Sequence, residues 1–168
     1  MNPFALCAIT ALIPLLVGFL WYSPKTFGPA FLKATGLTEE SGKTMNMPLV
    51  FGLTYVFSFF ISFVLSSIVI HQGGLFGLLQ PEMNNPDAPG AIDALKAAGA
   101  MFEHKFRTFR HGAVHGTITG LFLITPVIAI NAMFERKGWK YILIHAGFWI
   151  VCCILIGGTL CQFADFTK

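Results

Sequence analysis

The chain has 168 residues, of which 55% are hydrophobic and only 11% are charged. A soluble domain normally has about 25% charged residues, so this chain has too little charge to cover a water-facing surface. Its net charge of +3 is small and does not form the clustered basic face that nucleic-acid binding requires. We therefore expect the lipid bilayer as its main partner and no nucleic acid.

Four apolar blocks predict four transmembrane helices, at about residues 4–22, 48–71, 112–134 and 140–163. Each block has close to the roughly 20 residues that a helix needs to cross the hydrocarbon layer. None contains Asp, Glu, Lys or Arg between its ends. Backbone groups in hydrocarbon must bond to one another, which favours helices. The sequence thus predicts an all-α membrane protein, a single membrane domain over residues 1–168, with four helices bundled as two hairpins.

The four spans place both termini and the loop 72–111 on one side of the membrane, and the loops 23–47 and 135–139 on the other. Slightly more Lys and Arg residues lie near the helix ends on the side of the two shorter loops. Because basic loops tend to stay in the cytoplasm, this bias predicts that both termini are periplasmic.

The loop 72–111 has two parts. Residues 72–90 are rich in Gly, Asn and Pro and predict an irregular segment. In residues 91–110, apolar side chains recur every three to four positions with charged ones between them. This pattern predicts an amphipathic helix that lies in the headgroup region before the third span. The alternative is that it continues straight into the third span as one long helix.

Small residues recur at every fourth position in the second and third blocks. Such a step keeps them on one side of a helix, where they let another helix approach closely in lipid. Helix packing is the first interpretation, and a polar pathway lined by the hydroxyls is the alternative. The residues concerned are Ser58, Ser62 and Ser66 in the second block, and Gly112, Gly116 and Gly120 in the third.

Three histidines, His104, His111 and His115, are spaced seven and four residues apart. On one continuous helix all three would lie within about 40° of one another. Two His at positions i and i+4 can share a metal ion, and imidazole suits zinc, copper or iron. The third ligand would be His104 or else His145. Because no Asp or Glu lies beside these residues within the span, hydrogen bonding to headgroups or water is the other interpretation. We predict no other cofactor.

Asn131 and His145 are polar residues inside the predicted last hairpin, where polar groups are costly and often functional. The short connection predicts that they lie side by side and form a hydrogen bond, with a binding role as the alternative. The sequence has no Ser–His–Asp set, Gly-rich phosphate loop or paired carboxylates, so nothing in it points to an enzyme.

The segments "GFLWYSPKTFGPAFLKATGLTEE", "HGAVHG" and "AINAMFERKGWKYILIHAGFWIV" resemble the DUF1761 family of small bacterial membrane proteins with four helices and unknown function. The resemblance covers nearly the whole chain and implies a location in the bacterial inner membrane. It implies no activity. Its most specific part is the W-Y-S-P-x-x-F-G motif, formed by Trp21, Tyr22, Ser23, Pro24, Phe27 and Gly28.

Three functions remain open at this point. The small-residue stripes and the lack of catalytic groups favour a self-associating structural or accessory subunit of a membrane complex. A small oligomeric transporter or channel is the first alternative. A metal- or lipid-handling membrane protein that uses its histidines is the second.

Overall fold

The computed structural model describes residues 1–85 and 87–165, and these ranges are helical with no strand. Four helical segments of the described chain are long and apolar enough to cross a membrane: Pro3–Trp21, Met47–Val69, Phe109–Phe134 and Trp139–Phe163. The prediction of an all-helical chain with four apolar helices of spanning length is thus confirmed. These helices are those of a multi-pass membrane protein.

The first span is interrupted just before its internal proline. α1 (Pro3–Thr10) and α2 (Ile13–Trp21) are separated by a turn, in which the N–H of Leu12 donates to the carbonyl of Ile9 at 3.1 Å. Pro14 lies in the first turn of α2, where its missing N–H has no helical partner to lose. The proline therefore starts a new helical segment instead of bending a continuous one.

The third span is interrupted in a similar way. α7 (Phe109–Thr119) and α8 (Thr125–Phe134) are joined by η3 (Gly120–Ile124), which is a π-helical turn. Pro126 again lies in the first turn of the segment that follows. The wider π turn accommodates the carbonyls that the proline leaves without their usual partner.

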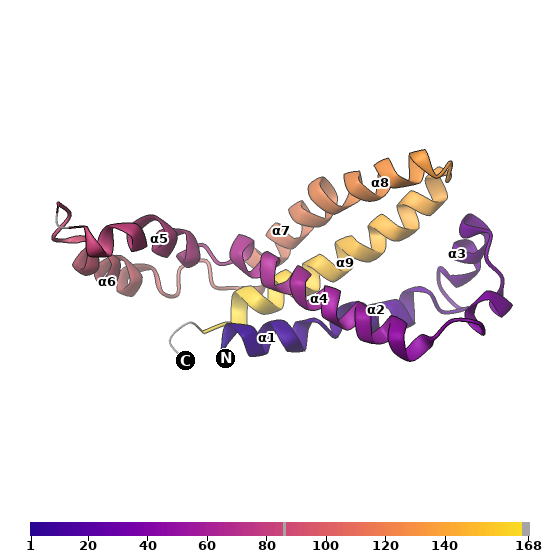
Figure 1. Cartoon of the computed structure of the whole chain (residues 1–168), viewed down its shortest axis with the longest axis horizontal. Helices are drawn as coiled ribbons and strands as arrows, with labels where there is room; N and C mark the ends of the chain where they lie inside the picture. The colour runs from indigo at the N-terminus through magenta and orange to yellow at the C-terminus, as the bar shows by residue number, and fades with distance from the viewer. Residues whose placement is uncertain (86, 166–168) are drawn as a thin grey trace.

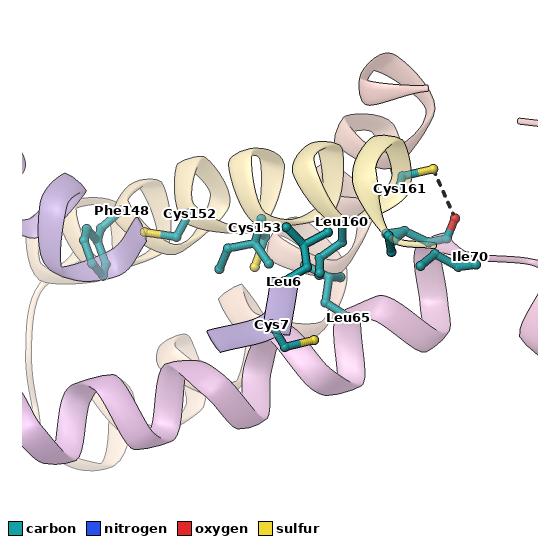
Figure 2. Packing of buried hydrophobic residues seen from close by; sticks show 12 residues of the cluster. Leu6, Cys7, Leu65, Ile70, Phe148, Cys152, Cys153, Leu160 and Cys161 are labelled. Atoms are coloured by element: carbon teal, nitrogen blue, oxygen red, sulfur yellow. Dashed lines mark hydrogen bonds between the residues drawn. The ribbon is translucent and has the colours of Figure 1, made fainter. Parts of the chain in front are cut away.

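α9 (Trp139–Phe163) is the central helix. It contacts α1, α2, α7, α8 and α4 (Met47–Val69), and Figure 1 shows it between the α7–α8 pair and the other spans. Half of its most apolar stretch is buried, against 11% for the third span. The core gathers around it, with small sulfur-containing side chains at several positions (Figure 2). The buried core residues are Leu6, Cys7, Leu65, Val69, Ile70, Phe148, Cys152, Cys153, Ile156, Leu160, Cys161 and Ala164.

The backbones of α7 and α9 touch each other through glycines. A Cβ atom at Gly112 would fall against the carbonyl of Gly157, and one at Gly116 against the carbonyl of Cys153. From the other side, a Cβ at Gly157 would lie 2.6 Å from the carbonyl oxygen of Gly112. A Cβ at Gly120 would lie 2.8 Å from the backbone of α9. The interface has no room for side chains at these positions, as in other close helix pairs of membranes.

The serine side chains along one face of α4 are also buried within the chain. Ser58 and Ser62 are 1% and 0% exposed, and Ser66 is 9% exposed. The Ser66 hydroxyl donates to the carbonyl of Phe63 at 2.7 Å, the local bond that Ser commonly forms within a helix. The small residues of α4, α7 and α9 are therefore covered within a single copy of the chain.

The two chain ends meet at one end of the bundle. The N-terminal ammonium of Met1 donates to the carbonyl of Phe163 at 3.0 Å, and the N–H of Asp165 donates to the carbonyl of Met1 at 2.7 Å. α3 (Gly28–Thr35) and η1 (Glu39–Gly42) lie at the opposite end (Figure 1). The four segments thus run from one end to the other and back twice.

The segment between the second and third spans is more helical than its composition predicts. α5 (Gln72–Leu79) and α6 (Ala91–Phe102) pack against each other beyond the end of the spans, with η2 (Gln80–Asn84) after α5 (Figure 1). Packing against α6 outweighs the weak helix preference of the glycines in α5. Six residues separate α6 from α7, so the amphipathic helix does not continue into the third span. Its location among headgroups stays a prediction.

We expect Gly116→Ala to lower the free energy of unfolding by about 1–3 kcal/mol, because α7 and α9 must separate to admit the methyl group. Gly52→Ala in α4 is the matched control, since its Cβ would meet nothing within 4 Å. It should leave stability unchanged or raise it by about 0.5–1 kcal/mol. Unfolding in mixed detergent micelles, followed by circular dichroism, measures both variants. Equal stability of the two would contradict the close contact.

Candidate metal centre

Three histidines converge at the end of the bundle where the termini lie. His71 follows the end of α4, and His111 and His115 lie in the first two turns of α7. The Nε2 atom of His71 is 2.9 Å from Nε2 of His111 and 3.3 Å from Nε2 of His115. One ligand atom from each of the three residues lies within 4.8 Å of the others. His71 is exposed and the other two are half-buried, so the cluster is accessible from outside the chain.

The N-terminus of α7 is fixed by its cap and by its glycines. The side chain of Thr108 accepts a hydrogen bond from the N–H of His111 at 3.2 Å, which fixes the start of the helix. Gly112 and Gly116 then fix the rotation of α7 against α9. Each glycine directly follows one of the histidines, so the same rotation directs His111 and His115 to an adjoining face.

A cysteine of α9 contacts the backbone on either side of the cluster. The Sγ atom of Cys161 is 3.5 Å from the carbonyl oxygen of Val69 (Figure 2) and 3.2 Å from that of Phe106. Val69 ends the helix that precedes His71, and Phe106 lies in the segment that leads to α7. The thiol therefore lies between the two parts of the chain that carry the histidines, and its single S–H donates to one of these carbonyls at a time.

An aromatic ring lies against the cluster. Phe106 stacks on His111 with 5.0 Å between ring centroids and 20° between planes, and it is nearly perpendicular to His71 with 6.4 Å between ring centroids. Phe106 has a φ of 62°, a left-handed conformation that is uncommon for a bulky residue and is found at functional sites. Its ring shields one side of the imidazoles.

A cavity of about 270 Å³ adjoins the cluster and shares His71 with it. Gln72 lies in its wall and donates from its amide to the carbonyl of Phe102 at 2.7 Å and to that of Lys105 at 3.1 Å. These bonds fix the segment after α6 against the start of α5. The lining residues are His71, Gln72, Leu75, Phe102, Lys105 and Phe106.

The ligand set differs from the one that the sequence indicates. His104 is exposed and lies outside the cluster, because α6 and α7 are separate helices and the spacing on a continuous helix does not apply. His71 takes that place and was missed. Four spans put the end of the second block and the start of the third at the same membrane face, and this topological signal could have identified it.

His145 lies at the other end of the bundle and has a different partner from the one predicted. Its Nδ1 atom is 3.3 Å from the hydroxyl of Tyr22, while Asn131 is exposed on α8. Among the described residues its Nε2 atom is buried without a hydrogen bond. Burial raises the pKa of the Tyr22 phenol, so Tyr22 stays protonated at neutral pH.

The W-Y-S-P-x-x-F-G motif forms a compact turn against α9 at this same end. The Trp21 indole N–H donates to the carbonyl of Ile144 at 3.2 Å, and its ring lies 4.4 Å from that of Phe27. The N–H of Gly28 donates to the carbonyl of Ser23 at 3.1 Å. A Cβ at Gly28 would lie 2.5 Å from that carbonyl oxygen, so the turn requires glycine there. Pro24 occupies the turn between them.

A family model described as "Protein of unknown function (DUF1761)" matches residues 6–161 of the chain. The chain belongs to this family. No curated protein matches it, and no solved structure does. The DUF1761 match covers His71, His111 and His115 as well as the Trp21 turn. The family description assigns no activity, so the function of this DUF1761 protein must be inferred from the geometry of its side chains.

We expect Gln72→Glu to loosen the wall of the cavity in this DUF1761 protein. The substitution replaces an amide donor with a carboxylate that the carbonyls of Phe102 and Lys105 repel. Trypsin should then cleave after Lys105 and Arg107 about fivefold faster, since losing a partly buried hydrogen bond costs about 1 kcal/mol. Gln80→Glu, which changes an exposed side chain of η2, is the control. Cleavage followed by mass spectrometry measures the rates, and equal rates would contradict the role of Gln72.

Proposed function

We propose that this chain is a metal-binding membrane protein that holds a divalent cation of the zinc class through His71, His111 and His115. The observation that carries the proposal is the convergence of three imidazole nitrogens from two separate segments. Two ligands at the usual Zn–N distance and a tetrahedral angle would lie roughly 3.3 Å apart. The Nε2 atom of His71 is 3.3 Å from that of His115, which matches this value, and 2.9 Å from that of His111, which is shorter than it.

Hydrogen bonding among the histidines explains this arrangement less well. A neutral imidazole nitrogen carries either one N–H or one lone pair. Nε2 of His71 lies within 3.3 Å of two other Nε2 atoms, and its single N–H or single lone pair forms a linear hydrogen bond with only one of them. A cation accepts a lone pair from each of the three, so it suits the cluster better than any assignment of protons.

The ligand chemistry narrows the choice of metal and of role. Three imidazoles suit zinc, copper, nickel or cobalt rather than magnesium or calcium, which prefer oxygen. Three protein ligands leave a position on the cation for water or another ligand, as in catalytic rather than structural zinc sites. The half-buried location supports a cation that stays accessible to such a ligand.

A self-associating or accessory role stays a prediction with weaker support. The small residues that favour it are covered within the chain, where Gly112 and Gly116 meet α9 and Ser62 is buried. A transport path along the hydroxyls of α4 loses support for the same reason. Apolar side chains remain exposed on α8, among them Phe134 at 87%, and lipid is sufficient to cover them.

The chain is purified with a tag that contains no histidine and is stripped of metal with a chelator. We expect it then to bind about one Co²⁺ per chain, with visible d–d absorption bands. His71→Ala should weaken binding at least about tenfold, and His111→Ala/His115→Ala should abolish it. His104→Ala is the matched control because His104 is exposed and outside the cluster. Circular dichroism checks that each variant is folded. Equal Co²⁺ affinity of His71→Ala and His104→Ala would overturn the proposal.

We further propose that the chain resides in the bacterial inner membrane with both termini, and therefore the histidine cluster, on the periplasmic side. The charge bias of the loops supports this orientation. Alkaline phosphatase fused after residue 165 should be active, since it folds in the periplasm, and a green fluorescent protein fusion at the same point should be dark. A bright and phosphatase-inactive pair would place the termini in the cytoplasm and contradict the orientation.

A further inference from the structure

The cavity beside the histidine cluster has one charged group in its wall. His71 belongs to both cluster and cavity, so the cavity adjoins the position of the proposed cation. Lys105 also lines the cavity. Among the described residues, none that lines the cavity is acidic. Glu103 is close in sequence, but it contributes its backbone carbonyl to Gln72 at 3.4 Å and does not line the cavity.

The rings of Phe102 and Phe106 lie close to the Lys105 ammonium, and Phe106 also contacts an imidazole of the cluster. The Nζ atom of Lys105 is 5.1 Å from the ring centroid of Phe102 and 5.7 Å from that of Phe106. Phe106 in turn stacks on His111 at 5.0 Å. Because His71 and Lys105 both line the cavity, the ammonium and a divalent cation held by His71 would bring two positive charges to the same cavity, where they repel each other unless an anion offsets them. Neutral imidazoles do not compensate the charge of the cation.

The remaining wall is apolar. Leu75 of α5 and the rings of Phe102 and Phe106 supply it. The cavity lies just beyond the ends of two membrane spans, at α4 and α7. Molecules with a charged head and an apolar tail concentrate at this depth of a bilayer. A charged end and an apolar wall within one cavity match such a molecule better than they match a free inorganic ion.

We propose that the cavity binds the anionic head of an amphiphile, a carboxylate or phosphate carried on an alkyl chain. This inference rests on the metal function proposed above. The head lies between the cation held by the three histidines and the ammonium of Lys105. The first carbons of the tail lie against Leu75, Phe102 and Phe106.

The test uses the full chain loaded with Co²⁺ in a neutral detergent. The d–d bands report the metal's own ligands, so an amphiphile that merely dissolves in the micelle does not change them. We expect decanoate to shift the bands, 1-decanol to leave them unchanged, and acetate to act at a concentration at least about tenfold higher, because acetate has no tail to bury. Decyl phosphate should likewise shift the bands at a lower concentration than inorganic phosphate.

Variants of Lys105 and of Lys96 separate the contribution of Lys105 from general charge effects. Lys105→Ala should raise the half-saturating decanoate concentration about fivefold, as expected for loss of a partly exposed ion pair, and Lys105→Arg should stay near the original chain. Lys96→Ala, an exposed lysine of α6 outside the cavity, should have no effect. All four proteins should bind Co²⁺ equally.

The outcomes distinguish this inference from the proposed function. A chain that binds no Co²⁺ would remove the metal site and this inference with it. A Co²⁺-loaded chain whose bands do not respond to decanoate would overturn the inference alone. Equal half-saturation by decanoate and acetate would assign the position to a free anion, and an unaltered response of Lys105→Ala would remove Lys105; either result also overturns it.

Discussion

The contact between the backbones of α7 and α9 constrains the rest of this structure. Gly112 and Gly116 meet Gly157 and Cys153 with no side chain between them. In lipid there is little hydrophobic drive for helices to associate, so close contact of this kind supplies the attraction. It also fixes α7 about its own axis, since any other rotation would bring a side chain into the interface. This fixed rotation also determines the direction of the other side chains of α7.

The histidines depend on this packing because each of them directly precedes a glycine of the interface. With α7 fixed, His111 and His115 point toward the end of α4, where Cys161 of α9 contacts the backbone at Val69 and Phe106. His71 then completes the cluster. One face of this short segment therefore attaches α7 to α9, and the adjoining face presents two imidazoles.

Much of the fold could be predicted from the sequence, because charge-free apolar blocks of spanning length permit few structures. The helix that α5 forms could not, since its glycines indicate a loop and its order comes from contact with α6. In the candidate site, the i and i+4 spacing of His111 and His115 was visible. His71 is 40 residues away, and the break between α6 and α7, which removes His104, depends on the Thr108 cap and the turn at Phe106. The spacing of histidines along one helix predicts neither the inclusion of His71 nor the exclusion of His104.

The central claim is that the packing of α7 on α9 assembles a three-imidazole metal site with His71. X-ray absorption at the zinc edge of the zinc-loaded chain tests it most directly. The account predicts three imidazole nitrogens at about 2.0–2.1 Å with one further light ligand, and a loss of one imidazole in His71→Ala. A zinc shell without imidazole scattering, or the same shell in both proteins, would contradict it.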